Sequence, residues 1–379
     1  MTSAPAVGHL APILGVGRAL RDAGHTVRVA THPERHGLIN DAGLEPVAAG
    51  MSGARMEQER ALRWPETTGQ PNTAWAVRMF TQILAPTVLA DLLRLIEDWR
   101  PDLIVHEEGE YAGPVGGAQA GIPWVTHAWG SPLRPVEELV SLEEHAVGLW
   151  TSVGLEVLPS SGLYRYGLVD PCPAMLQVGA PGASVVWPVR PAALSDRSEA
   201  DTADTADSAD AYVGFGTVPR FADDFDILAA AARSCAARGL RTVVTTTNDE
   251  IAARLSDEGG GRVLGRTFVS LTAVLQTCQV VVCHGGAGTV LAALSRGVPL
   301  VIVSKGAPSQ VRMAEACANA GVAAVAAVTD ADADANSIET AVNLVLDTPT
   351  FRQRAETVAG QISAMPEPAA LIGALEAVV

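Results

Sequence analysis

The 379-residue sequence contains few aromatic residues, few charged residues and no long apolar run. Aromatic side chains make up 4% of the chain and charged side chains 18%, whereas 48% of the residues are hydrophobic, which is the composition of a globular protein. No apolar stretch reaches the ~18 residues that span a membrane, and the N-terminus lacks the basic and then apolar pattern of a signal peptide. The length suits two domains of ordinary size, each able to bury a core.

Positive charge and paired cysteines are also scarce. The 42 acidic residues outnumber the 26 basic ones and give a net charge of -16, which argues against nucleic acid or anionic membranes as partners. The odd number of cysteines and the absence of a CxxC pair offer neither a zinc site nor a disulfide framework. Such cysteines suit a reducing compartment, so we predict a cytoplasmic protein. They are Cys172, Cys235, Cys278, Cys283 and Cys317.

One segment has a strongly biased composition. Residues 195–210 are almost wholly Asp, Ala, Thr and Ser, carry like charge and show no apolar periodicity, which is typical of a solvated linker. We expect it to separate an N-terminal domain of residues 1–194 from a C-terminal domain of residues 211–367. Residues 368–379 form a short apolar helix in this prediction, and the helix packs back on the first domain.

On both sides of the linker, short β-rich runs alternate with helical patterns, which indicates parallel sheets with crossover helices. Residues 73–99 have helical spacing despite Pro86. We therefore predict an α/β protein of two doubly wound, Rossmann-like domains that face each other across a cleft, where the carboxyl ends of the strands bind ligands. The expected strands are residues 26–31, 44–48, 103–106 and 124–127, and then 211–215, 241–246, 262–264, 280–283, 300–303 and 322–325.

The most informative stretch of the chain is Val280–Thr289. A β-branched run typical of a buried parallel strand leads into His284-Gly285-Gly286-Ala287-Gly288-Thr289, and a helix-like stretch follows from Val290. Glycines let the backbone approach a ligand closely, and a helix start offers unpaired N–H groups to a phosphate. The spacing differs from the dinucleotide fingerprint and from the P-loop. It predicts a nucleotide diphosphate held without a protein lysine; the alternative is a tight turn with a structural histidine.

Further motifs stand in order around this loop. They include Gly8-His9-Leu10-Ala11-Pro12, Ala23-Gly24-His25-Thr26-Val27, Pro101-Asp102-Leu103-Ile104-Val105, Phe268-Val269-Ser270-Leu271 and Gly297-Val298-Pro299. Together they resemble the inverting glycosyltransferases of the GT-B fold that decorate antibiotics, macrolides and polyketides and are related to the UDP-glycosyltransferases. The resemblance covers nearly the whole chain.

The resemblance implies a nucleotide-diphosphate sugar, dTDP- or UDP-linked, as co-substrate, with no cofactor and no metal. It makes residues 1–194 the acceptor-binding domain and residues 211–367 the nucleotide-sugar-binding domain. It assigns the diphosphate to His284, Gly286, Ala287, Gly288 and Thr289, with Gly216 and Thr217 facing the phosphates from the other side. Phe268 and Val269 match the segment that contacts the nucleobase.

The resemblance also implies a catalytic base. Transfer requires removal of a proton from the acceptor hydroxyl, and histidine suits this task because its ordinary pKa of ~6.5 lies near working pH. The base of the family corresponds to His9. The family places an aspartate after the strand at residues 103–106, and here that position is Glu107, with Glu108 as a competitor and Glu110 close by. The alternative is that these acids form a solvated loop.

The chain departs from the family pattern at two places. Members open with a hydrophobic central strand, whereas here only Met1 to Val7 precede Gly8, so we expect the native product to carry several more Val-, Leu- or Ile-rich residues. Members also show an acid followed by Gln as sugar ligands, but this chain has Ser309 and Gln310. A site with fewer sugar hydrogen bonds tolerates a deoxysugar.

The acceptor side is indicated by tryptophan. Of the tryptophans in the first domain we expect Trp129 and Trp64 to contact a flat aglycone, while core packing is the alternative for each of them.

These features predict a hexosyltransferase that moves a deoxysugar to a natural-product aglycone as a monomer or homodimer. Two alternatives remain: a non-catalytic helper that binds nucleotide sugar, and a sugar-nucleotide 2-epimerase. The sequence leaves the sugar, the aglycone and the choice between O- and C-glycosylation open.

Overall fold

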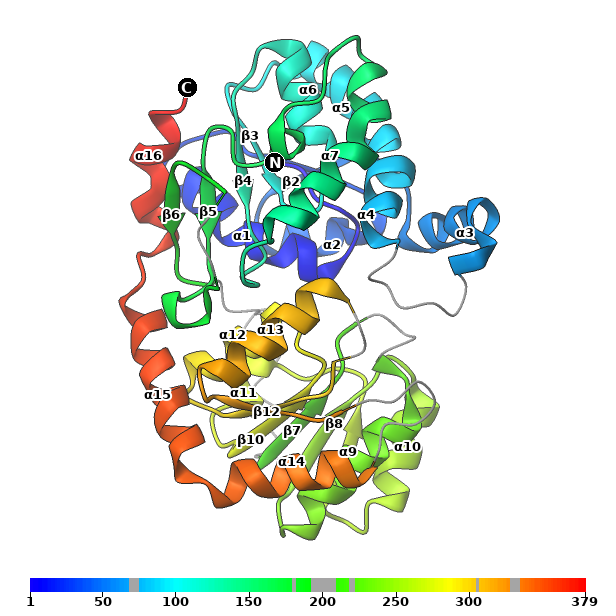
Figure 1. Ribbon diagram of the computed structural model, residues 1–379, viewed down its shortest axis with the longest axis vertical. Helices are drawn as coiled ribbons and strands as arrows, with labels where there is room; N and C mark the ends of the chain where they lie inside the picture. Colours follow the sequence, from blue (N-terminus) through cyan, green and yellow to red (C-terminus); the bar gives the residue numbers. More distant parts are fainter. Residues whose placement is uncertain (68–74, 179–181, 192–208, 218–221, 305–306, 328–334) are drawn as a thin grey trace. The chain divides into compact units, whose positions relative to one another are not determined.

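The structure is a computed structural model that describes residues 1–67, 75–178, 182–191, 209–217, 222–304, 307–327 and 335–379. The chain divides into two compact units, each with helices packed around a parallel sheet (Figure 1). Unit 1 comprises Met1–Cys172, Val178–Ala192 and Met365–Val379, and unit 2 comprises Pro173–Gln177 and Ala193–Ala364. Residues 195–208 of the expected linker lie outside the described residues.

Unit 2 contains a parallel sheet with the strand order β12-β11-β10-β7-β8-β9 among its described residues. The chain builds outward from β7 to one side and then restarts at β10 on the other. The carboxyl ends of β7 and β10 therefore form the switch point at which doubly wound sheets bind ligands. The strands are β7 (Ala211–Gly214), β8 (Thr242–Thr245), β9 (Val263–Arg266), β10 (Val280–Cys283), β11 (Leu300–Ile302) and β12 (Ala323–Val325).

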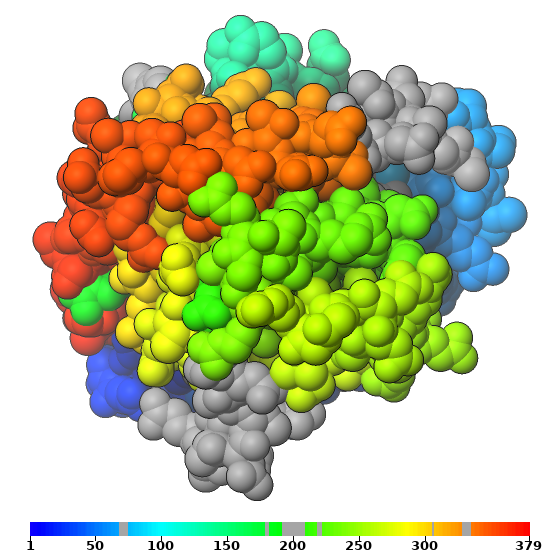
Figure 2. Space-filling view, turned by 90° about the horizontal axis from the view of Figure 1, so that it is seen from below, coloured from blue at the N-terminus to red at the C-terminus, as the bar shows by residue number. Residues whose placement is uncertain are grey.

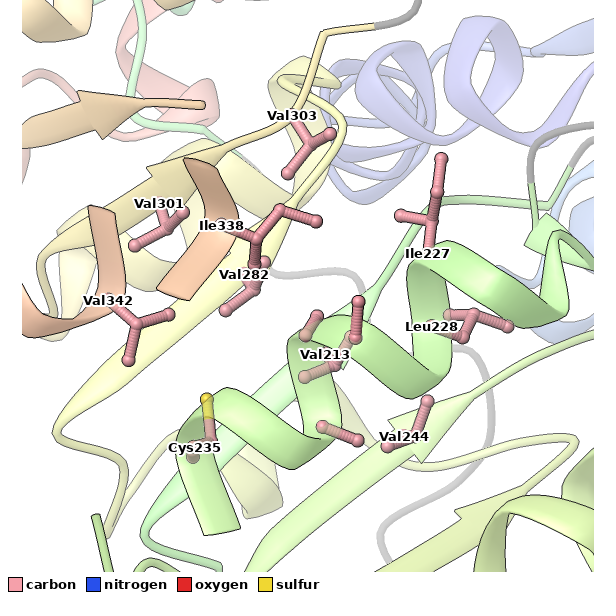
Figure 3. Close-up of a cluster of buried hydrophobic side chains, with 14 of the residues drawn as sticks. Val213, Ile227, Leu228, Cys235, Val244, Val282, Val301, Val303, Ile338 and Val342 are labelled. Carbon is pink, nitrogen blue, oxygen red and sulfur yellow. The ribbon is translucent and has the colours of Figure 1, made fainter. Parts of the chain in front are cut away.

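Helices cover this sheet and bury its β-branched residues. Val213, Val282 and Val301 of the strands meet Ile227 and Leu228 of α9 in a buried hydrophobic cluster that also includes residues of α14 (Figure 3). Helix α14 lies beside α9 on the surface of the unit (Figure 2). The helices of unit 2 are η6 (Ala174–Leu176), α9 (Phe225–Ala237), α10 (Asp249–Glu258), α11 (Leu271–Val274), α12 (Ala287–Ser295), α13 (Pro308–Asn319), α14 (Ala335–Asp347) and α15 (Pro349–Ala364).

Unit 1 has the same kind of sheet with a very short central element. Thr2 forms parallel bridges to Ala30 and to His106, and its N–H donates to the Val105 carbonyl at 3.0 Å. The first residues of the chain thus lie between β1 and β3, and a switch point arises there. The strands are β1 (Arg28–Thr31), β2 (Glu45–Ala48), β3 (Ile104–Glu107), β4 (Trp124–His127), β5 (Leu168–Asp170) and β6 (Val186–Pro188).

A long helical run in unit 1 passes Pro86 without a break. The π-helical turn η4 (Phe80–Leu84) precedes it, so the proline falls in the first turn of α5, where its missing N–H leaves no bond unmade. Among the described residues, the run Ala76–Trp99 is long and apolar enough to cross a membrane, but half of its most apolar window is buried. Val88 and Leu89 belong to the core, as in the core helix of a globular domain.

The remaining helices surround the sheet of unit 1. Leu371 and Leu375, near the C-terminus, pack there with Val16 and Leu20 of α1. The helices are α1 (Val7–Asp22), η1 (Pro33–Arg35), α2 (His36–Asp41), α3 (Gly53–Arg63), η2 (Pro65–Thr67), α4 (Ala76–Met79), α5 (Ala85–Trp99), α6 (Ala112–Ala120), α7 (Val136–Thr151), η5 (Pro159–Gly162), η8 (Pro368–Leu371) and α16 (Ile372–Glu376).

Candidate active site

The switch point of unit 1 holds a histidine and a carboxylate in contact. His9 lies in the first turn of α1, and Glu107 is the last residue of β3. The His9 Nδ1 atom is 3.0 Å from the Glu107 Oε1 atom. The histidine side chain remains 18% exposed, while the glutamate side chain is fully buried. One partner can therefore reach a substrate, and the other is sealed behind it.

The Glu107 carboxylate is held by donors on both of its oxygens. Oε1 lies 3.0 Å from His9 and accepts from the Ala4 N–H at 3.1 Å, and Oε2 accepts from the Gly109 N–H at 2.6 Å and from the Trp129 indole N–H at 2.5 Å. Burial by itself raises the pKa of this carboxyl, but the charge and hydrogen bond of His9, followed by the backbone N–H groups, lower it from 4.5 to about 2. The group is an anion at neutral pH.

The neighbouring acids have other partners. Glu110 accepts from the Thr2 hydroxyl at 2.5 Å and from the N–H groups of Ala112 and Gly113 at the start of α6. Burial raises the pKa of Glu110 to about 7 in spite of these donors. Glu108 is also buried and interacts electrostatically with Arg134. The solvated-loop alternative is wrong, because all three acids are at most 2% exposed.

Aromatic rings surround the imidazole. His9 stacks on Phe80 with 5.3 Å between ring centroids, and Trp129 lies against it with 4.4 Å between centroids at a tilt of 52°. Trp129 thus contacts both members of the His9–Glu107 pair. Trp64, the second tryptophan expected at the acceptor site, lies under the guanidinium of Arg78, at 4.3 Å, and packs against the core cluster, so its role stays a prediction.

The switch point of unit 2 holds the glycine-rich loop. Helix α12 begins at Ala287, three residues before the expected Val290, and its N-cap residue Gly286 has no capping side chain. The N–H groups of Ala287, Gly288 and Thr289 therefore occupy the first turn, where an α-helix has no internal partners for them. This is the geometry that attracts an anion.

His284 lies between two glycines at this point. A Cβ atom at Gly216 would come within 3.0 Å of its ring, and one at Gly286 within 2.4 Å of its Nε2 atom. Burial lowers the pKa of His284 from 6.5 to about 4, against a hydrogen bond with the Gly214 backbone that raises it, so the imidazole is neutral at pH 7. Its Nδ1 atom is buried and has no hydrogen-bond partner within the described ranges.

Two more unpaired polar atoms follow the next strand. Ser309 and Gln310 lie in the first turn of α13, and Gln310 Oε1 is buried without a partner in the described part of the chain. The same holds for Ser304 Oγ, which comes two residues after β11. Gly285 has φ +84° and lies against the Gln310 backbone, so the glycine-rich loop and the first turn of α13 are in contact. Sequence reasoning missed Ser304, although its place after a buried strand was a signal.

The remaining predicted donor residues also follow the carboxyl ends of strands. Gly216, with φ +86°, and the exposed Thr217 come after β7. Phe268, whose side chain is 44% exposed, and the half-buried Val269 come after β9. An exposed phenylalanine offers a face on which a flat ring can stack. Among the described residues, no group of three or more His, Cys, Asp or Glu side chains could hold a metal ion.

The sequence was compared with known families and proteins. Residues 18–186 match the N-terminal domain, and residues 241–378 the C-terminal domain, of the family described as Erythromycin biosynthesis protein CIII-like. The L-demethylnoviosyl transferase of Streptomyces niveus is 30% identical over 325 residues, which cover 80% of this chain and 78% of that protein. The chain belongs to this family of antibiotic glycosyltransferases.

Other members of the family are similar over greater lengths. The tylactone mycaminosyltransferase of Streptomyces fradiae is 26% identical over 97% of this chain and 89% of that protein. The structure of the spinosyn rhamnosyltransferase SpnG matches this glycosyltransferase with a TM-score of 0.78 at 26% identity, over 99% of this chain and 98% of that chain. SpnG has also been solved with a spinosyn aglycone and with thymidine diphosphate.

These findings confirm the predicted family and the predicted GT-B class of fold. The chain is a glycosyltransferase of antibiotic biosynthesis that transfers a sugar to an aglycone.

Proposed function

We propose that this enzyme transfers a deoxysugar from a dTDP- or UDP-sugar to a natural-product aglycone with inversion, and that His9 is the general base. The observation that carries the proposal is the contact between His9 Nδ1 and Glu107 Oε1 in unit 1. A histidine held by a buried carboxylate is the arrangement that other enzymes use to activate a hydroxyl.

The tautomer of His9 follows from its partner. An ionised carboxylate only accepts hydrogen bonds, so the Nδ1 atom that faces Glu107 carries the proton. The neutral imidazole then has its free lone pair on Nε2, which is the atom that takes up a proton from the acceptor. Glu107 stabilises the imidazolium that results, because the carboxylate is buried and stays charged.

The proposed step is a single displacement at the anomeric carbon. His9 Nε2 takes the hydroxyl proton as the acceptor oxygen forms its bond to the anomeric carbon. The bond from that carbon to the diphosphate oxygen breaks in the same step, and the nucleoside diphosphate leaves with the electron pair. One displacement inverts the configuration at the anomeric carbon.

Unit 2 supplies the donor site in this proposal. The first-turn N–H groups of α12 and the neutral His284 would donate to the diphosphate as negative charge develops on it, without a metal. The unpaired Gln310 Oε1 and Ser304 Oγ atoms favour a hydroxylated ligand nearby. Phe268 would stack on the nucleobase.

The sugar and aglycone are proposed from chemistry and from the relatives. Ser309 stands where a carboxylate would bond sugar hydroxyls, so the site favours a sugar with fewer of them. Two relatives are named for the sugars that they transfer, a demethylnoviosyl and a mycaminosyl group, and these names guide the choice of donors to test. SpnG binds thymidine diphosphate, which supports a dTDP-sugar for this chain.

The test is a transfer assay with a small panel of dTDP- and UDP-sugars and polyketide aglycones. We expect product with a dTDP-deoxysugar, and nuclear magnetic resonance of the product should show an inverted anomeric centre. His9→Ala should lower kcat by about 10²-fold or more while donor binding is kept, since base catalysis contributes about 10²–10⁴-fold. Near-normal turnover by His9→Ala, or retention of configuration, would refute the mechanism.

A further inference from the structure

Three functional groups of unit 1 converge on the backbone of Gly109. A Cβ atom placed on this glycine would lie 2.6 Å from Trp129 Cζ2, 3.1 Å from His9 Cε1 and 3.2 Å from Glu107 Oε2. Any side chain here would displace at least one of them. The absence of a Cβ therefore lets the indole reach the carboxylate and the imidazole together.

We propose that Trp129 is a positioning residue, which fixes the Glu107 carboxylate and the His9 ring in their reactive geometry. This inference rests on the proposed role of His9 as the base. It differs from the sequence-based expectation for Trp129, which was contact with the aglycone.

The indole acts on the pair through two different contacts. Its N–H donates to Glu107 Oε2 at 2.5 Å, which leaves Oε1 to face His9. Its ring lies 4.4 Å from the His9 ring and restricts rotation of the imidazole. Glutamate has one more rotatable bond than aspartate, so its carboxylate needs more restraint, and Trp129 and Gly109 supply it by both donating to Oε2.

Neighbouring side chains also hold Trp129 in place. The Arg134 guanidinium lies 5.4 Å from the centroid of the indole, within the range of a cation–π contact. Arg134 is only 6% exposed and also donates to the Glu108 carbonyl at 3.3 Å. The indole of Trp129 thus contacts both the Arg134 guanidinium and the His9 imidazole. These two contacts restrict its movement, as its proposed positioning role requires.

The decisive variant is Trp129→Phe, which keeps an aromatic ring and removes the N–H donor. We expect kcat to fall about tenfold, which is the effect of losing one hydrogen bond to a charged group, with KM for both substrates changed less than about twofold. A fall in kcat with both KM values kept separates a positioning role from a contact with the aglycone, which would raise the aglycone KM.

A double variant tests whether Trp129 acts through Glu107. If it does, adding Trp129→Phe to Glu107→Gln should lower kcat by much less than it does in the wild type. Trp150→Phe is the matched control, because its indole N–H donates to Ser161 Oγ at 3.0 Å in the core of the same unit. It should lower thermal stability and leave kcat near that of the wild type.

Two results would overturn the inference: an unchanged kcat in Trp129→Phe, or a rise in the aglycone KM alone, which would make Trp129 an acceptor contact. If Trp129→Phe does not fold, Gly109→Ala pushes on the same indole, with Gly148→Ala as a control in open space. Gly109→Ala should also lower kcat, and normal turnover would refute the inference. These outcomes differ from a failure of the proposed base, because that failure would show as near-normal turnover by His9→Ala.

Discussion

The imidazole of His284 lies so close to Gly286 that a Cβ atom at residue 286 would be 2.4 Å from its Nε2 atom. Real Cβ atoms essentially never approach so closely, and a Cβ at Gly216 would also come within 3.0 Å of the ring. Gly286 has φ -67° and ψ 133°, a conformation open to alanine, so the constraint on residue 286 is one of space. The relationship ties the position of His284 to the start of α12.

We therefore predict that Gly286→Ala weakens binding of thymidine or uridine diphosphate by about tenfold or more, because His284 or the first turn of α12 must shift. Isothermal titration calorimetry measures the change. Gly360→Ala is the matched control, since a Cβ at Gly360 meets nothing within 4 Å. Equal affinities for the two variants would show that the His284–Gly286 contact is unrelated to the nucleotide.

His284→Ala should weaken the same binding by about tenfold, because a hydrogen bond to the charged diphosphate contributes about 1.5–3 kcal/mol. The neutral state of His284 adds a second expectation. Since burial lowers its pKa to about 4, the contribution of His284 should stay constant from pH 8 to about pH 5. Calorimetry at both ends of this range tests it. An unchanged dissociation constant in a folded variant would remove His284 from the donor site.

Glu107→Gln should lower kcat by about 10²-fold, because an amide cannot stabilise the imidazolium and can fix the wrong tautomer of His9. Donor affinity should stay near that of the wild type, since the donor residues belong to unit 2. Glu108→Gln is the comparison, and its effect should be much smaller because Glu108 interacts with Arg134. If Glu108→Gln were the more damaging change, the assignment of the two acids would be reversed.

Ser309→Asp should shift preference toward more fully hydroxylated sugars. A carboxylate at this position accepts hydrogen bonds from hydroxyls but stays desolvated and unpaired against a deoxysugar. The change suits the fold, because residue 309 lies in the first turn of α13, where negative charge is favourable. Competition between two donors that differ in one hydroxyl measures the shift. A constant ratio of kcat/KM values would mean that residue 309 does not face the sugar.

His106 should destabilise unit 1 on acidification, whereas Glu110, whose pKa burial raises to about 7, acts in the opposite direction. The His106 side chain is fully buried; its Nδ1 lies 2.9 Å from the Glu110 carbonyl oxygen, and its Nε2 lies 2.9 Å from Thr126 Oγ1. Burial lowers the pKa of His106 from 6.5 to about 4. Between these values residue 106 binds more protons in the unfolded chain, so its contribution to the free energy of unfolding falls as pH falls through this window, by up to about 3 kcal/mol.

His106→Gln should recover about 2 kcal/mol of this acid-induced loss at about pH 5, because the amide keeps similar hydrogen bonds and does not titrate. Urea unfolding followed by tryptophan fluorescence reports on unit 1, since all 7 tryptophans belong to it. Part of the pH dependence should remain, because burial also lowers the pKa of His127 to about 4. Identical pH dependence in variant and wild type would contradict the prediction.

The sequence alone determined the features that are local in the chain. The run Val280–Cys283 is three valines and a cysteine and lies where predicted, because a parallel strand buried on both faces must be apolar along its length. The turn after it is also local, because Gly285 has φ +84°, a backbone conformation that favours glycine. Strands β5 and β6 were missed, because each is three residues long and ends on Asp170 or Pro188, whereas the equally short β11 and β12 are apolar throughout.

Only the tertiary structure decided how distant residues combine. His9 and Glu107 are 98 positions apart, and spacing alone could not join them or separate Glu107 from Glu108. The indole of Trp129 reaches Glu107 because β3 and β4 are neighbours in one sheet, a contact that the sequence did not predict. The burial of the three acids was hidden for the same reason. Burial and hydrogen bonding depend on which elements pack together, and this is set by the whole fold rather than by neighbours along the chain.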